Sequence, residues 1–315
     1  MRPFSLTVMM YHYVRDPGDS AENGSGIGGM ALSHFVSQLN YLMANYEMID
    51  WLGLRDFLLG GRSLPERACL LTFDDGVRDH YLNVFPELRK RGLSGLFFSL
   101  ARQPEMGLTL GHQLHFLLAR LGFLELREAF LNRLEADQRV MFAQADVKYR
   151  ELEQPGSLEG EIEVFKLILQ RELSEIGRPV LSRLIEAAIG PEFEIAAGFF
   201  LNQDQMAEMV AGKMHFGGHS QNHPWFDWIG TSRQAQEIDA SAGWLLTLEQ
   251  GPWAFAYPYG GWSAQSPELL RARGFLAGFT TIPQSYHTTP YEIGRYNAES
   301  FTPEMMAGDP TGGQA

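Results

Sequence analysis

Apolar and polar residues alternate along the chain in a way that predicts strands and helices in turn. Apolar runs rich in β-branched and aromatic residues indicate buried strands at 5–13 and 68–73. Apolar residues at helical spacing follow at 79–91, and another strand is predicted at 94–100. Because consecutive parallel strands need a crossover helix between them, this order favours an α/β fold with parallel pairing.

The pattern changes over residues 101–200. Segments dense in Leu, Glu and Arg, such as 115–129 and 162–176, predict amphipathic helices, and no convincing strand interrupts them before Phe193. We therefore expect an all-helical insertion at 101–200 inside one domain that spans 1–315. The inserted helices are also a candidate surface for association with a second copy of the chain.

Strands and helices alternate again after the insertion. The predicted strands are 213–218, 253–257 and 276–280, with helices between them. In parallel α/β folds, functional sites are built where the carboxyl ends of the strands meet. Polar side chains that directly follow these strands are therefore candidates for a functional site.

Composition narrows the class of protein. The 315 residues are 45% hydrophobic and 20% charged, with a net charge of −13 and no strongly basic run, which argues against nucleic acid as a partner. No apolar run reaches membrane-spanning length, and the first residues lack the pattern of a signal peptide. The single cysteine, Cys69, excludes an intrachain disulfide. We expect a cytoplasmic location and no transmembrane segment.

Two adjacent carboxylates follow the predicted strand at 68–73, in the sequence Thr72-Phe73-Asp74-Asp75-Gly76. Neighbouring residues that leave a strand can point in different directions, so one carboxylate could bind a metal while the other faces a substrate. Gly76 permits the tight turn that this needs. Taken alone, the same residues could form a turn that caps the next helix.

A second motif, His219-Ser220-Gln221-Asn222-His223, follows the strand at 213–218. Two histidines four apart can bind one metal if the backbone makes one helical turn. A pair of histidines alone is more often structural, but together with a carboxylate it gives an incomplete ligand shell. Such a shell leaves room for water and substrate, as a hydrolytic metal requires.

The combination of these motifs resembles the NodB-homology polysaccharide deacetylase family, also called carbohydrate esterase family 4. Its Thr-Phe-Asp-Asp-Gly and His-Ser/Thr-x-x-His motifs are both complete here. The resemblance covers residues 5–100 and 200–300 approximately, and not the insertion. It implies a distorted (β/α)7 barrel, with Asp75, His219 and His223 as metal ligands and Asp74 as the general base.

The resemblance also implies roles for residues outside the two motifs. Tyr259, in the loop after the strand at 253–257, would donate its backbone N–H to the oxyanion. The sequence Met10-Tyr11-His12 is similar to branches of the family in which the first strand supplies the acid, so we assign that role to His12. Trp225, Trp228 and Trp262 are candidates either for stacking on sugar rings or for core packing.

The chain departs from the family pattern at one position that bears on catalysis. Many members carry an arginine that orients the base, and the matching residue here is Ala256. We hypothesise that Arg295 replaces it. The remaining histidines have no neighbouring residues that suggest a shared site. His112 and His115 lie in the insertion, and we expect them to pack or to lie on a solvated helical surface rather than to contact substrate.

The predicted function is removal of an N-acetyl group from an amino sugar of a surface polysaccharide or of its nucleotide- or lipid-linked precursor. Two imidazoles and a carboxylate suit Zn²⁺, and also Co²⁺ or Ni²⁺. One alternative is hydrolysis of another C–N bond, in a cyclic imide or an allantoin-like amide, on the same barrel. The other is a sugar-binding protein without activity.

Overall fold

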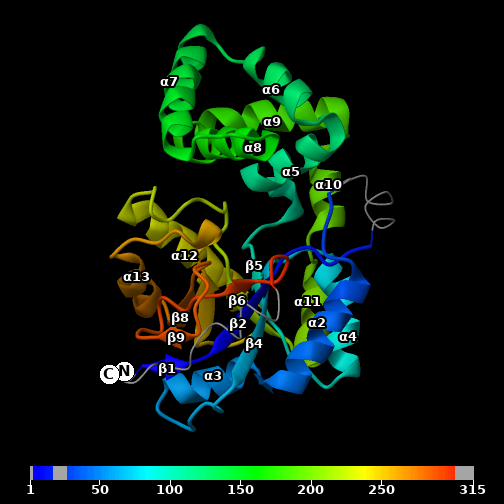
Figure 1. Cartoon of the computed structure of the whole chain (residues 1–315), viewed down its shortest axis with the longest axis vertical. Coiled ribbons are helices and arrows are strands. Elements are labelled where there is room, and N and C mark those ends of the chain that lie inside the picture. Colours follow the sequence, from blue (N-terminus) through cyan, green and yellow to red (C-terminus); the bar gives the residue numbers. More distant parts are fainter. Residues whose placement is uncertain (1–2, 17–26, 302–315) are drawn as a thin grey trace.

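Parallel strands form a curled sheet at the centre of the molecule (Figure 1), as seen in a computed structural model that describes residues 3–16 and 27–301. Its strands are β2 (Thr7–Tyr11), β4 (Ala68–Asp75), β5 (Leu96–Ser99), β6 (His215–Gly218), β7 (Trp253–Ala256), β8 (Phe275–Phe279) and β10 (Tyr296–Asn297). Their order in space is β10-β2-β4-β5-β6-β7-β8, and the short β3 (Glu47–Ile49) also pairs with β4. All of these pairings are parallel, as the sequence predicts.

The segment 293–297 brings the two edges of this sheet together. Ile293 forms a parallel bridge with Phe279 at the end of β8, and a few residues later β10 pairs with β2. The sheet therefore curls into a distorted barrel, which confirms the predicted fold class. Outside it, β1 (Phe4–Ser5) and β9 (Tyr286–His287) form a small antiparallel pair.

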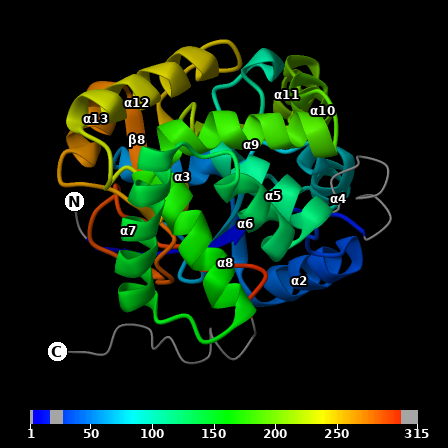
Figure 2. The ribbon, with the colours of Figure 1, turned by 90° about the horizontal axis from the view of Figure 1, so that it is seen from above.

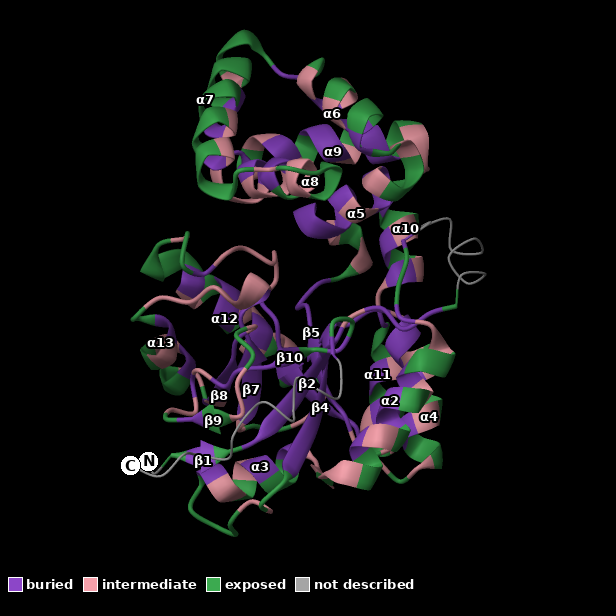
Figure 3. Ribbon diagram, viewed as in Figure 1, coloured by how far each residue is buried: buried purple, intermediate pink, exposed green. Residues whose placement is uncertain are grey.

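Side chains that alternate in direction along the strands form two apolar cores, one inside the barrel and one beneath the outer helices. On β4, Leu70 belongs to the apolar cluster inside the barrel, together with Phe98 and Phe279. Leu71 and Phe73 point the other way and pack in the cluster beneath the outer helices. Figure 3 shows the central strands as largely buried. Because side chains alternate, Thr72 and Asp74 share the inward direction of Leu70.

Helices cover the outside of the barrel. They are α2 (Leu32–Asn45), α3 (Trp51–Leu58), η1 (His80–Val84), α4 (Phe85–Lys90), α11 (Gln203–Ala211), α12 (Thr231–Leu245) and α13 (Ser266–Ala272), with the short turn η4 (Pro258–Gly260) between β7 and α13. The predicted helix at 79–91 corresponds to η1 followed by α4. Within the described residues, no helix is both long and apolar enough to cross a bilayer.

The segment between β5 and α11 is helical and lies over the carboxyl end of the barrel (Figures 1 and 2). It contains η2 (Pro104–Met106), α5 (Leu110–Leu121), α6 (Phe123–Leu131), α7 (Ala136–Glu153), α8 (Leu158–Leu167), η3 (Ile168–Glu172), α9 (Ser174–Ala188) and α10 (Glu192–Phe199). These helices share their own apolar cluster, which includes Leu114, Phe165 and Leu181.

Two helices predicted in this segment are each divided. The predicted helix 115–129 breaks at Gly122, whose φ of 74° is left-handed and ends α5. The predicted helix 162–176 runs through α8 and η3 and is interrupted at Leu173, whose φ of −121° is not helical. Apolar spacing continues across both breaks, so periodicity alone does not reveal them.

Candidate metal centre

Asp74 and Asp75 lie at the carboxyl end of β4 but point in different directions. Asp74 keeps the inward direction of its strand, whereas Asp75 has a φ of 74°, which breaks the alternation. Gly76 follows with a φ of 65°, and a Cβ there would lie 2.6 Å from the Ser99 hydroxyl. Only glycine fits this close approach without strain. The turn thus points the two carboxylates in different directions, as the sequence predicts.

His219 and His223 follow β6 on a tight loop. The backbone between them does not make the helical turn that we considered as a way for both to bind one ion. Ser220 and His223 are both left-handed, with φ of 64° and 57°, and the Ser220 hydroxyl accepts a hydrogen bond from the His223 N–H at 2.9 Å. Left-handed backbone is uncommon for residues other than glycine and clusters at functional sites.

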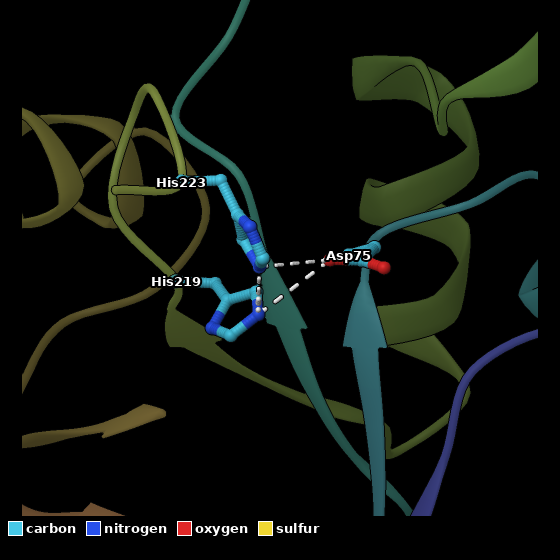
Figure 4. A group of neighbouring side chains, drawn as sticks. All are labelled: Asp75, His219 and His223. Carbon is cyan, nitrogen blue, oxygen red and sulfur yellow. Dashed lines mark hydrogen bonds and ion pairs between the residues drawn. The ribbon is translucent and has the colours of Figure 1, made fainter. Parts of the chain in front are cut away.

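The loop brings both imidazoles to Asp75 (Figure 4). Each Nε2 atom lies 3.5 Å from Asp75 Oδ1, and the two Nε2 atoms lie 3.1 Å apart. Asp75 and His219 are almost fully buried, at 6% and 2% exposure. Three potential ligand atoms thus converge from two loops that are 144 positions apart in the sequence, from Asp75 to His219.

The donor atoms fit a divalent cation. A tetrahedral ion with bonds of 2.0–2.1 Å would hold its ligand atoms about 3.3 Å apart, close to the separations observed here. His219 Nδ1 donates to the Ala256 carbonyl at 2.7 Å, so Nε2 is the nitrogen that offers a lone pair when the ring is neutral. Asp75 Oδ1 is buried and has no hydrogen-bond partner among the described residues. Three acceptor atoms facing one another favour a cation between them.

Electrostatics keep Asp75 ionised. Burial alone raises the pKa of Asp75, but His112 and His219 outweigh it and hold that pKa well below its ordinary value. Burial, and then the neighbouring His219, lowers the pKa of His223 well below its ordinary value, which keeps that ring neutral. An ionised carboxylate and a neutral imidazole are the forms that bind metals.

Asp74 is paired with Arg295, the residue that the sequence analysis put forward in place of the family arginine. The two groups form a bidentate pair, with Nη1–Oδ1 at 2.6 Å and Nη2–Oδ2 at 2.8 Å. Burial raises the pKa of Asp74, but Arg295 and His219 outweigh it and hold that pKa below its ordinary value. His12 Nε2 lies 4.0 Å from Asp74 Oδ2, and its side chain is 36% exposed.

Tyr259 lies against the metal ligands. Its ring centroid is 4.4 Å from that of His223, and its φ of 57° is left-handed. On its other side it stacks on Trp225, with centroids 4.6 Å apart. Arg171 of the insertion also lies over the Trp225 ring, with its Cζ atom 4.0 Å from the ring centroid.

These contacts bear on the role of Trp225. Tyr259 and Arg171 both pack on its indole, which favours the packing role over stacking on a sugar ring. Its Nε1–H donates to Gln170 Oε1 of η3 at 3.1 Å, and Trp228 Nε1–H donates to the Arg171 carbonyl at 2.8 Å. The pair therefore attaches the insertion to the barrel. Trp262 packs against the main core.

Sequence reasoning missed His112. It lies on α5, is 3% exposed, and places Nε2 3.5 Å from Asp75 Oδ2. The sequence analysis expected packing or a solvated helical surface at this position. No local signal could have identified it, because its proximity to Asp75 depends on how the insertion docks. His115, one turn further, instead bonds to the Tyr13 hydroxyl at 3.1 Å.

Further residues that sequence reasoning missed hold the loop between the two histidines. The Glu237 carboxylate accepts from the backbone N–H groups of Gln221 and Asn222, at 2.8 and 2.9 Å. Arg102 and Arg178 both donate to Asn222 Oδ1, at 3.1 and 3.3 Å. Since Arg178 lies on α9, the insertion also contacts the loop that carries the histidines.

Comparison with known proteins points to polysaccharide deacetylases. The family model for polysaccharide deacetylases matches residues 180–278. A Bacillus subtilis protein, YxkH, named for polysaccharide deacetylase activity, is 26% identical over 115 residues, or 36% of each protein. The Escherichia coli poly-β-1,6-N-acetyl-D-glucosamine N-deacetylase is 42% identical over 53 residues, 16% of this chain. The matched stretches span 36% and 8% of these two relatives.

A solved structure extends the likeness to nearly the whole fold. The Streptococcus pyogenes deacetylase PplD, solved in complex with acetate, superposes with a TM-score of 0.56 over 94% of this chain and 92% of that one. At 17% identity this likeness concerns the fold alone. The residues matched by the family model include His219, His223 and Tyr259. Asp74 and Asp75 lie outside the matched residues. Residues 180–278 therefore match the polysaccharide deacetylase family, and the rest of the chain shares the fold of a solved deacetylase.

Proposed function

We propose that the chain is a metal-dependent deacetylase that removes an N-acetyl group from an amino sugar of a surface polysaccharide or its nucleotide- or lipid-linked precursor. The observation that carries this proposal is the convergence of Asp75, His219 and His223 on one point, with separations of 3.1–3.5 Å between their ligand atoms. Two imidazoles and a carboxylate suit Zn²⁺, which we propose as the ion, ahead of Co²⁺ or Ni²⁺.

The chemistry divides between the ion and the side chains. A divalent cation held by the three ligands would acidify a water molecule and polarise the acetyl carbonyl. Asp74 accepts the proton of the attacking water, and Arg295 holds both oxygens of that carboxylate in place. In this proposal Arg295 therefore takes the role that other family members give to an arginine at the position of Ala256.

Two further groups act on the acetyl group as its bond to nitrogen breaks. The backbone N–H of Tyr259, a residue whose ring lies against His223, donates to the oxyanion that develops on the acetyl oxygen. His12 donates a proton to the leaving amine. His12 suits this role because its side chain is partly exposed while it remains 4.0 Å from Asp74.

A cavity adjoins His223, one of the three candidate ligands. Its volume is about 150 Å³, and its walls include His223, Tyr259 and Trp225 from the barrel and Leu110 and Arg178 from the insertion. Substrate specificity would then depend on the insertion as well as on the barrel. We keep the cytoplasmic location as a prediction.

The direct test measures the acetate released from an oligomer of β-1,6-linked N-acetylglucosamine in the presence of Zn²⁺. Ring opening of a cyclic imide and of allantoin is measured in parallel. Acetate release that a chelator abolishes and Zn²⁺ restores supports the proposal. Ring opening without acetate release would assign the chain to other C–N hydrolases. Tight oligomer binding without either reaction would identify a binding protein.

A further inference from the structure

The helical insertion supplies one buried polar group to the metal centre. His112, near the start of α5, is 3% exposed, and its Nε2 lies 3.5 Å from Asp75 Oδ2. That Nε2 has no hydrogen-bond partner among the described residues, so Asp75 is the polar group it faces. A buried imidazole aimed at a buried carboxylate is costly unless the two act together.

Thr109 lies within hydrogen-bond distance of the other ring nitrogen of His112, Nδ1. The Thr109 hydroxyl lies 2.7 Å from His112 Nδ1 and also accepts the His112 backbone N–H at 3.4 Å as the N-cap of α5. When the hydroxyl donates to Nδ1, the proton of the neutral ring is on Nε2. His112 then presents an N–H to Asp75.

The two oxygens of Asp75 therefore have separate partners. Oδ1 faces His219 and His223 at 3.5 Å each, whereas Oδ2 faces His112. The Nε2 of His112 is not among the three ligand atoms that converge on one point. Its place is behind the carboxylate, where outer partners orient a metal ligand.

We propose that His112 is a positioning residue of the metal centre, and that the helical insertion thereby completes the site and is coupled to metal binding. This inference rests on the proposed metal-dependent function. By holding Oδ2, His112 fixes the rotation of the carboxylate and leaves Oδ1 for the ion. Binding of the ion in turn favours the docked position of α5, because coupling between two events is reciprocal.

The test is Zn²⁺ affinity, measured by competition with a chromophoric chelator. His112→Leu removes the N–H and should weaken binding about tenfold or more, the effect typical of outer partners. His112→Gln places an amide N–H near the same position and should stay within about threefold of the unaltered chain. Thr109→Val, which keeps the shape but removes the hydroxyl, should also weaken binding.

His115→Leu is the matched control. His115 lies on the same helix and also loses a side-chain hydrogen bond, to Tyr13, but it does not face Asp75. Its replacement should leave Zn²⁺ affinity unchanged. In addition, Zn²⁺ should slow hydrogen exchange in residues 110–121 of the unaltered chain and should do so less in His112→Leu.

The outcomes separate the two proposals. If the unaltered chain binds no divalent ion, the proposed function fails. If it binds Zn²⁺ and folded His112→Leu binds equally well, or His112→Gln loses as much as His112→Leu, the positioning role is overturned. Should His112→Leu not fold, Thr109→Val decides, because an unchanged affinity there also overturns the inference.

Discussion

Arg295 and Asp74 lie 221 positions apart in the sequence and form a bidentate ion pair inside the barrel. Arg295 is 0% exposed and the Asp74 side chain 3%. Arg295 Nε also donates to the carbonyl of Thr280, the residue after β8, at 3.0 Å. The guanidinium is therefore held by this backbone carbonyl as well as by the Asp74 carboxylate. The pair links the segment that closes the barrel to the carboxylate proposed as the base.

Loss of this arginine should affect stability and turnover together. Arg295→Met leaves the Asp74 carboxylate buried and unpaired, which should lower the free energy of unfolding by about 3–5 kcal/mol. Deacetylation should fall because the base is no longer held, while Zn²⁺ binding is largely retained. Denaturant unfolding and metal analysis check both points, with Arg295→Lys as a variant that keeps the charge but not the bidentate geometry. Unfolding within about 1 kcal/mol of the unaltered chain would contradict the account.

The base itself can be tested without disturbing the ion. Asp74→Asn keeps the size of the side chain but cannot accept the proton of water, so turnover should fall by roughly 10²–10⁴-fold. Asp75, which binds the ion, is unchanged, so the metal content should stay the same. Acetate release and metal analysis on one preparation measure both. Activity retained in Asp74→Asn rules out the assigned base.

His12 should affect turnover alone. His12→Gln removes the acid that protonates the leaving amine and should lower turnover by roughly 10²–10⁴-fold, with metal content and folding preserved. The partly exposed position of His12 makes a large loss of stability unexpected. A substrate whose leaving amine needs little protonation should be affected less. Equal losses for all leaving groups would argue against an acid at this position.

His80 should make stability depend on pH. It is fully buried, and its ring donates to the His12 carbonyl at 2.8 Å. Burial is the largest cause that lowers the pKa of His80, to about 4. In the unfolded chain the pKa is near 6.5, so between these values the unfolded state binds the proton and stability falls as pH falls.

The size of this effect follows from the two pKa values. Between pH 7 and pH 4.5, His80 should cost about 2.5 kcal/mol of unfolding free energy. Over the same pH range, the unfolding free energy of His80→Gln should fall by about 2.5 kcal/mol less than that of the unaltered chain. Replacing the exposed His34 by Gln should leave the pH dependence of stability as it is in the unaltered chain. Denaturant unfolding at the two pH values measures the difference. An equal loss in His80→Gln and the unaltered chain would exclude His80 as the cause.

The sequence allowed much of the barrel and its metal ligands to be predicted, because both depend on local patterns. Apolar runs mark the strands, and Asp75, His219 and His223 directly follow them, so parallel pairing brings these residues to one edge. The left-handed backbone at Ser220 and His223 was not predictable, since neither residue type requires it.

Other parts of the site depend on long-range packing. Placing Arg295 beside Asp74 required the resemblance to a family, because only closure of the barrel brings 293–297 to β2. His112 could not be placed at all, because α5 reaches Asp75 only when the insertion docks. The contact between Trp225 and Arg171 could not be predicted for the same reason, because Arg171 also lies in the insertion.

The most direct test of the central claim is metal stoichiometry. The unaltered chain, His219→Ala and His215→Ala would each be incubated with Zn²⁺, passed through a desalting column and analysed by mass spectrometry of the elements. His215 is a suitable control because it is also buried on β6, yet it lies near Glu249 rather than Asp75. We predict about one ion per chain in the unaltered protein and in His215→Ala, and almost none in His219→Ala. The same zinc content in all three proteins would contradict a metal centre formed by Asp75, His219 and His223.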